Sequence, residues 1–381
     1  MANVLTDLAA DIYTASDIVG RELTGASSSV MRNTSSERAA IGDPIRSHLT
    51  RQATALTPSP SMTIPEGTDQ TVDNKTLTIS KDRAVQIPWT GEDMKHVNNG
   101  SGFETIYGDQ IRQAMRTLSN EIEADVLTEG YRNASRAVGV AGTTPFSSDF
   151  KLVAQARQIL VDNGAPMDGQ ISMVLNTLAG TNLRNLAQLQ KANEAGGDQL
   201  LRQGALLDLQ GLILKESAGV QEHTKGTGSG RLVNSAALAK GDTVIPVDTG
   251  SGTVLAGDVV TFAGDTVNSY VVTKALAGGG DFEIAAPGLR VAPADNAAIT
   301  VGSSYTGNIA FHRNAIELVM RAPAVPAGGD TADDEMMVQD PSSGLVFAIR
   351  SYKGYRKAMF EVAAVWGKKC WKPDFVSTIL G

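Results

Sequence analysis

The spacing of apolar and polar positions divides the chain into stretches of different secondary structure. Between residues 102 and 136, apolar side chains recur at steps of three to five, from Phe103 through Ile111 and Ile122 to Val126, without a proline. This spacing places them on one face of a helix. At 1.5 Å per residue, such a helix is on the order of 50 Å long. The pattern therefore predicts a long helix that crosses a flat domain.

The stretch from 226 to 304 has a different pattern. Short Val/Thr/Ile runs, at 243–247, 257–262 and 270–273, are separated by Gly-Asp pairs. Short runs of this composition between turn residues are typical of strands. The Gly/Ser run at 225–230 suits a hinge into this stretch. We therefore expect a small β-barrel inserted into a loop of a larger domain.

The first 90 residues predict parts that lack a core of their own. Residues 1–48 have a helical tendency but are broken by glycine and serine, which indicates an arm. Residues 49–90 alternate at period two, above all in 75–80 and 84–89, and predict a long two-stranded hairpin. An isolated hairpin is marginally stable in water. Both parts are expected to lie on another surface, although the arm could also be a helix packed on its own domain.

The remaining stretches predict compact α/β structure. A helix is expected to end at Asn163 and Gly164, followed by a buried strand at 170–175 and a helix over 176–192. Asn176 or Thr177 is a candidate N-cap of that second helix. A further strand is expected at 211–217. After the β-rich stretch, residues 308–320 resume the main domain, and strands at 345–349 and 359–364 close it.

Composition narrows the function classes. The net charge of the 381 residues is −8, and an acidic chain does not attract nucleic acid by bulk electrostatics. No segment approaches the ~20 apolar residues of a membrane span. The first residues lack the basic and apolar parts of a signal peptide. The single cysteine, Cys370, excludes an intrachain disulfide and is expected to be an inert thiol in a reducing compartment.

No motif for catalysis stands out. The four histidines have no metal-ligand spacing with one another or with the cysteine. No phosphate-binding loop, dinucleotide motif or nucleophile elbow is present. The sequence therefore predicts neither an enzyme nor a cofactor.

The order of these parts resembles the major capsid protein of tailed double-stranded DNA bacteriophages, in the branch with an inserted β-barrel domain. The segments that carry the resemblance are 86–90, 209–217 and 311–316, together with the order and lengths of the parts. It implies an α+β fold with an N-terminal arm, an extended hairpin loop, a peripheral domain with a spine helix, and an axial domain. The implied divisions are 1–48 arm, 49–90 hairpin loop, 91–144 peripheral domain, 145–225 axial domain, 226–304 inserted all-β domain, 305–330 axial return, and 331–381 peripheral domain and C-terminal strands.

The resemblance also implies a function. Arms and hairpins would overlap neighbouring subunits in pentamers and hexamers of an icosahedral virion capsid, assembled in the host bacterial cytoplasm. The implied partners are further copies of the chain, scaffolding and portal proteins, a decoration protein, and packaged DNA held without sequence-specific contacts. Two alternatives remain open. One is the shell protein of a bacterial nanocompartment that encloses cargo enzymes, and the other is a soluble binding protein or adhesin with a β-domain.

Charged residues supply candidates for subunit contacts. The stretch 325–340 carries five acids and no base, whereas residues 345–381 carry seven bases and two acids. These could pair across subunits or be solvated faces, since exposed ion pairs contribute only ~0–1 kcal/mol each. Some members of the family cross-link a hairpin lysine to an asparagine of a neighbour, although solvated lysines are the favoured interpretation here. The candidates are Lys75, Lys81, Asp333, Asp334, Glu335, Arg350, Arg356 and Lys357.

Overall fold

The computed structural model describes residues 22–49, 55, 57–64, 73–97, 102–190, 208–340 and 343–381. Its fold is mixed α/β and consists mostly of strands. The arm helix expected near Leu5 to Tyr13 lies outside these residues.

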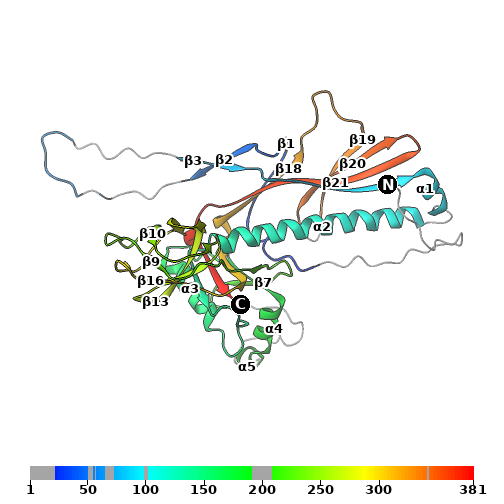
Figure 1. Ribbon diagram of the computed structural model, residues 1–381. Helices are drawn as coiled ribbons and strands as arrows, with labels where there is room; N and C mark the ends of the chain where they lie inside the picture. Colours follow the sequence, from blue (N-terminus) through cyan, green and yellow to red (C-terminus); the bar gives the residue numbers. More distant parts are fainter. Residues whose placement is uncertain are drawn as a thin grey trace.

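Helix α2 (Gly102–Arg132) lies along the first sheet of the molecule (Figure 1). Leu118, Ile122 and Val126 are fully buried at this contact, which confirms the helix and its apolar face. The helix approaches the second sheet so closely that a Cβ on Gly130 would lie 2.6 Å from Ile309 Cδ1. A side chain at that position would therefore displace the Ile309 side chain. The helix ends four residues before the predicted end, because Arg136 begins a strand.

The first sheet has the order β1-β18-β21-β20-β19. Strand β4 pairs with residues 357–366 of β21 on the side opposite β20, and β18 pairs with residues 365–370. Strand β1 runs parallel to β18, and the other pairs are antiparallel. The short helix α1 (Gly91–Val97) follows β4. The strands are β1 (Met31–Ala39), β4 (Lys81–Thr90), β18 (Ile316–Pro323), β19 (Ala332–Gln339), β20 (Val346–Gly354) and β21 (Lys357–Cys370).

Two expectations for the first 90 residues were wrong. The second half of the arm is strand β1, not helix. The hairpin consists of β2 (Pro44–Leu49) and β3 (Asp73–Thr78), whereas 84–89 belongs to β4 in the main sheet. Alternation at period two describes any half-buried strand and does not identify its partner. Strand β4 joins the sheet because Ile87 and Trp89 are buried beneath α2.

The second sheet gathers strands from distant parts of the sequence. In its centre β17 (Tyr305–His312) lies between β22 (Val376–Leu380) and β6 (Ile171–Leu175). The edge next to β6 is β7 (Ile213–Glu216), and β5 (Arg136–Gly139) pairs with β22 in parallel. The short strand β8 (Glu222–His223) pairs with β17.

Three helices pack against the second sheet: α3 (Lys151–Asp162), α4 (Thr177–Asn185) and α5 (Ala187–Gln190). Helix α3 ends at Asn163, as predicted. The Asn176 side chain caps α4 by accepting the Ala179 N–H at 2.8 Å, which confirms the expected cap. The single helix expected over 176–192 is divided, because Leu186 has an extended backbone.

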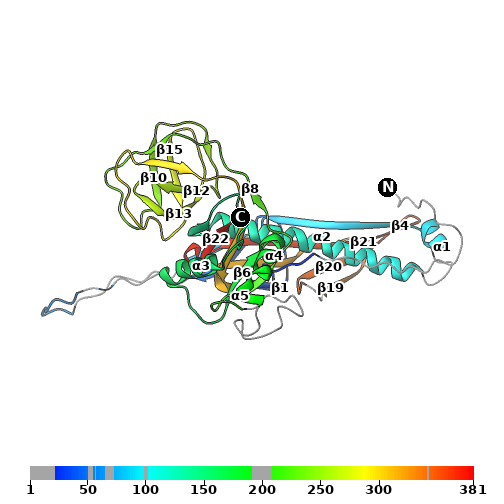
Figure 2. The ribbon, with the colours of Figure 1, turned by 90° about the horizontal axis from the view of Figure 1, so that it is seen from below.

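The β-rich lobe, residues 226–304, has a hydrophobic core of its own, in which Phe262, Tyr270 and Phe282 are buried. Figure 2 shows it as a separate lobe beside the two sheets. Its sheet continues into the second sheet, because β13 pairs with β5. The strands are β9 (Arg231–Val233), β10 (Val244–Asp248), β11 (Thr253–Val254), β12 (Val259–Phe262), β13 (Asp265–Lys274), β14 (Leu276–Ala277), β15 (Gly280–Ile284) and β16 (Ala298–Val301).

Candidate functional site

The β2–β3 hairpin has a fixed base and an uncovered far end. At the base, Leu77 is buried against Val319 and Trp371. At the far end, the loop residues Met62 and Ile64 are 106% and 91% exposed. Figure 1 shows the hairpin projecting beyond the rest of the molecule. Large apolar side chains that lie fully in water on a projecting loop indicate a contact with another molecule.

Residues 22–30 are attached to helix α2 by two carboxylates. The Glu123 side chain is fully buried and accepts the backbone N–H groups of Gly25, Ala26 and Ser27 at 2.8, 2.7 and 2.7 Å. Glu22 accepts bonds from the Arg116 guanidinium and from Asn120. The bonds from Arg116, followed by that from Asn120, lower the pKa of Glu22 to about 2. Glu22 and the residues that follow it are therefore fixed on α2.

Asp125 is the centre of an ion-pair cluster between α2 and the first sheet. Its carboxylate lies 2.8 Å from Lys368 Nζ and 3.0 Å from Lys81 Nζ, and it accepts the Trp366 indole N–H at 3.0 Å. Burial opposes the charge on Asp125, but the bonds from Lys368, Lys81 and Trp366 outweigh it and lower its pKa. For Lys81 the same balance raises the pKa, since burial is outweighed by Glu121 and Asp125.

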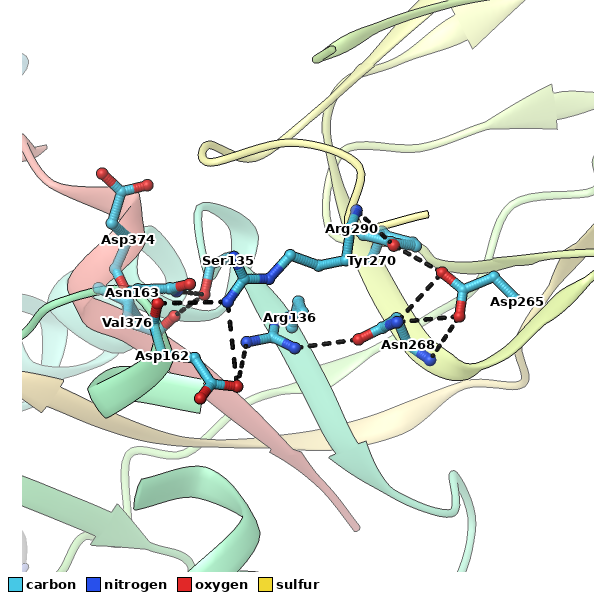
Figure 3. A network of polar contacts seen from close by, with 10 residues as sticks. All are labelled: Ser135, Arg136, Asp162, Asn163, Asp265, Asn268, Tyr270, Arg290, Asp374 and Val376. Atoms are coloured by element: carbon cyan, nitrogen blue, oxygen red, sulfur yellow. Dashed lines mark hydrogen bonds and ion pairs between the residues drawn. The ribbon is translucent and has the colours of Figure 1, made fainter. Parts of the chain in front are cut away.

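The β-rich lobe is joined to the body by a polar network (Figure 3). Arg136 of β5 donates to Asn268 Oδ1 of β13 at 2.9 Å and lies 3.4 Å from an Asp162 carboxylate oxygen at the end of α3. Arg290 of the lobe donates to the Asp162 backbone carbonyl at 3.3 Å. Burial and the nearby Arg290 lower the pKa of Arg136, against the opposite effect of Asp162. Arg136 and Arg290 therefore both contact Asp162 at the place where the β-rich lobe meets the body.

A second set of contacts connects the β-rich lobe to the residues just before it in the sequence. The buried His223 Nε2 lies 2.9 Å from Asp258 Oδ1, and Asp258 also accepts the N–H groups of Gly226 and Leu255. Gly257 has a φ of +101°, and a Cβ there would lie 2.9 Å from the His223 ring. The contact between His223 and Asp258 therefore requires a glycine at position 257.

The described residues lack a cluster of metal ligands. They contain no group of three or more His, Cys, Asp or Glu side chains that could hold a metal ion. Burial raises the pKa of the Cys370 thiol, which makes it unreactive as expected. Among the same residues, no helix is both long and apolar enough to span a bilayer.

Comparison with known proteins identifies the fold. No family model and no curated protein matches the chain. A structure from Mycobacterium phage Che8 matches 99% of this chain and 97% of its own, with 14% identity and a TM-score of 0.50. The capsid of Cyanophage P-SCSP1u matches 99% of this chain and 92% of its own, with 11% identity and a TM-score of 0.51. The mature capsid of bacteriophage PhiM1 gives 97% and 91% coverage, 9% identity and a TM-score of 0.50.

The chain has the fold of a phage capsid protein. The match runs over nearly the whole length of both chains. At identities of 9–14% the likeness establishes the architecture.

Within this capsid fold, the acidic stretch and the basic C-terminal stretch pair inside one chain. Glu335 of β19 lies 3.2 Å from Arg350 of β20, and it also pairs with Arg38 of β1. Asp333 lies 2.6 Å from Lys353. The pairing that the sequence suggested between subunits is therefore satisfied within the subunit for these residues. The reason is that β19 and β20 are antiparallel neighbours, so opposite charges face each other across the strand pair.

The other candidate residues have separate positions in the capsid fold. Lys75 stays on the hairpin, where its Nζ lies 5.6 Å from the Trp371 ring centre. Lys81 was expected on the hairpin, and this was wrong, because it begins β4 in the first sheet and belongs to the ion-pair cluster. Arg356 lies 3.4 Å from Glu92 at the exposed turn between β20 and β21. Asp334 and Lys357 form no ion pair with another described residue.

Sequence reasoning missed the buried Glu123, the half-buried Asp125 and the buried Arg136. A signal for the first two was present, because the acids Glu121, Glu123, Asp125 and Glu129 stand in the second half of a helix. Acids are unfavourable toward a helix C-terminus unless cations or N–H donors compensate them. For Arg136 no such signal exists, since its partner Asn268 is 132 residues away.

Proposed function

We propose that this chain is the major shell protein of a tailed-phage capsid. Copies of it self-assemble through overlapping arms and hairpins into an icosahedral shell around double-stranded DNA. The observation that carries the proposal is the match over 99% of this chain and 97% of the Che8 structure's chain. The exposed Met62 and Ile64 support it, because a second copy would remove them from water.

The domain assignment is part of this proposal. The residues before β2 are assigned as the arm. Strands β2 and β3 with the residues between them are assigned as the extended hairpin loop, since β4, which the sequence division 49–90 included, lies in the first sheet. Helix α2 and the first sheet are assigned to a peripheral domain, which comprises residues of 91–144 and 331–381 together with β4, β18 and, from the arm, β1. The second sheet with α3 to α5 is assigned to an axial domain, which comprises residues of 145–225 and 305–330 together with β5 and β22. Residues 226–304 are assigned as an inserted domain, supported by their separate core.

The proposed role is structural and not enzymatic. The buried pairs at Glu123, Asp125 and Arg136 hold each subunit rigid, while the uncovered loop supplies contacts to its neighbours. The net charge of −8 suits a container, since a basic inner wall would retain the genome during packaging and release. Proposed partners are further copies of the chain, scaffolding and portal proteins, a decoration protein and the packaged DNA. The proposed location is the virion, after assembly in the bacterial cytoplasm.

Electron microscopy of the expressed protein, with analysis of the particle contents, tests the proposal. Closed shells that take up double-stranded DNA when supplied with the packaging components of their phage support it. Small shells filled with a cargo enzyme indicate a nanocompartment instead. A discrete low-order oligomer that binds a ligand through the β-rich lobe indicates a soluble binding protein and rejects the proposal.

A further inference from the structure

The two sheets are connected directly by a short 3-10 helix, η1 (Arg313–Ala315). The residue before it, His312, ends β17 and lies opposite Ile171 of β6 in the second sheet. The residue after it, Ile316, begins β18 and lies opposite Cys370 of β21 in the first sheet. The chain therefore passes from one sheet to the other within three residues.

Backbone hydrogen bonds hold η1 from both sides. The Arg313 N–H donates to the Gln170 carbonyl at 3.0 Å, immediately before β6 of the second sheet. The Trp371 N–H, immediately after β21 of the first sheet, donates to the Ala315 carbonyl at 2.8 Å. The conformation of η1 therefore influences how β18 leaves the second sheet.

The His312 side chain caps η1. Its Nδ1 accepts the Asn314 N–H at 3.2 Å, as the side chain of an Asn or Asp does in an Asx turn. Its Nε2 lies 3.2 and 3.3 Å from the two carboxylate oxygens of Asp168. A backbone N–H can only donate and an ionised carboxylate can only accept, so Nδ1 carries no proton and Nε2 carries one. The two contacts together require the neutral imidazole.

The surroundings of His312 favour this neutral form. The N–H of Gln170 donates to Asp168 at 3.0 Å, and this bond, followed by that with His312, outweighs burial and lowers the pKa of Asp168. The Asp168 side chain is 41% exposed, so water screens its attraction for a charged imidazole. The His312 side chain is 3% exposed, and burial disfavours the charged form of a group. A proton added at Nδ1 therefore removes the acceptor of the Asn314 N–H and gains little from Asp168.

Other charged groups lie on the elements around His312. The cations are Arg32 of β1, Arg313 of η1 and Lys372, which follows β21, and a cation opposes a second positive charge. The Phe375 ring packs against the imidazole with ring centres 6.1 Å apart. Its neighbour in the chain is the acid Asp374, whose pKa is raised by burial. The titration of Asp374 therefore has to be separated from that of His312 in any test.

We propose that His312 is an acid-sensitive switch in the connection between the two sheets. The neutral imidazole holds η1 and so fixes β18 relative to β17. Protonation at Nδ1 releases the Asn314 N–H and loosens this connection. The inference does not depend on the shell function, because it concerns contacts within a single chain.

Hydrogen exchange of the unassembled full-length chain between pH 8 and pH 5 tests the proposal. Rates for the peptide that covers residues 313–316 are divided by the intrinsic rate at each pH. The cap is present while the imidazole is neutral and is lost as the pH falls through the range in which imidazoles ordinarily titrate. Protection of this peptide is therefore expected to fall by about fivefold toward pH 5, which corresponds to the typical contribution of an N-cap.

Three variants identify the group that titrates. In His312→Asn, the Asn side chain accepts the same N–H but does not titrate, so protection should stay within about twofold over the whole range. In Asp374→Asn, the fivefold fall should remain. The matched control is His96→Asn, at an exposed histidine of α1, and it should also keep the fall. Circular dichroism and the melting temperature establish that each variant is folded.

Three outcomes overturn the proposal. They are constant or rising protection in the unmodified chain toward pH 5, an equal fall in His312→Asn, and disappearance of the fall in Asp374→Asn. If His312→Asn fails to fold, His312→Ser replaces it, because a serine hydroxyl also accepts the N–H two residues on and does not titrate in this range. The same constant protection is then expected of the serine variant, and an equal fall in it overturns the proposal.

Discussion

The Glu123 carboxylate on helix α2 accepts the backbone N–H of Ala26 at 2.7 Å, across 97 residues of sequence. It accepts two more N–H groups from the residues on either side. A buried carboxylate is strongly unfavourable without such donors, and three buried N–H groups without an acceptor are also unfavourable. Each side of the contact therefore requires the other.

Glu123→Gln should destabilise the protein by about 1–3 kcal/mol, because a carboxamide has one acceptor oxygen where three N–H groups need partners. Urea denaturation measures the change in the free energy of unfolding. Limited proteolysis should also cleave the variant faster near residues 22–30. Glu92→Gln is the control, since the Glu92–Arg356 pair is exposed and contributes only ~0–1 kcal/mol. Equal effects of the two substitutions would contradict the role assigned to Glu123.

Glu22 should contribute to stability against acid. Its pKa is about 2 in the folded chain and 4.5 as the ordinary value, so the unfolded state binds the proton more readily. Stability from this group is therefore present above about pH 4.5 and is lost as the pH falls toward 2. Glu22→Gln should flatten the dependence of stability on pH in that window and leave its slope unchanged near pH 7. If the free energy of unfolding falls by the same amount between pH 4.5 and pH 2 with and without the substitution, the contact with Arg116 is contradicted.

Met62→Ser with Ile64→Ser should impair assembly without affecting the single chain. Both side chains are fully exposed, so the melting temperature of the unassembled protein should remain unchanged. The yield of particles in sedimentation should fall, because their burial against a second copy is lost. Val140→Ser with Met167→Ser, at two other exposed apolar positions, provides the control. Normal assembly of the Met62/Ile64 variant would show that this loop is not a subunit contact.

Arg136→Lys should loosen the β-rich lobe from the body. One ammonium group cannot reproduce the guanidinium contacts to both Asn268 and Asp162. Hydrogen exchange should accelerate at the β13–β5 pair, while the lobe core around Phe282 stays protected. The control is Arg83→Lys at an exposed ion pair with Glu121, where no such change is expected. Uniform acceleration across the whole chain would indicate general destabilisation instead.

The parts of the fold that depend on local pattern were predictable from the sequence. The apolar spacing identified α2, and Asn176 and Asn163 marked the start of α4 and the end of α3. The strand pairings were not predictable, because alternation at 84–89 fits a hairpin and a sheet equally well. The pairing of β4 with β21 depends on residues 275 positions apart, such as Gln86 and Glu361.

The candidate site was predictable only in part, for the same reason. Charge content placed Glu335 and Arg350 among the candidates for pairing between the acidic and basic stretches, but it gave neither this pair nor its position within one chain. The contacts of Glu123 and Arg136 join residues that no local pattern relates. A buried charge far from its partner in sequence is visible only when the backbone has brought the two together.

The most direct test of the proposed self-assembly is analytical ultracentrifugation of the purified chain over a range of protein and salt concentrations. If the exposed loop and the arm are completed by other copies, the chain converts to shell-sized particles as concentration rises, and electron microscopy shows closed shells. A compact monomer at every concentration and salt, with the Met62–Ile64 loop protected from proteolysis, would contradict the proposed function.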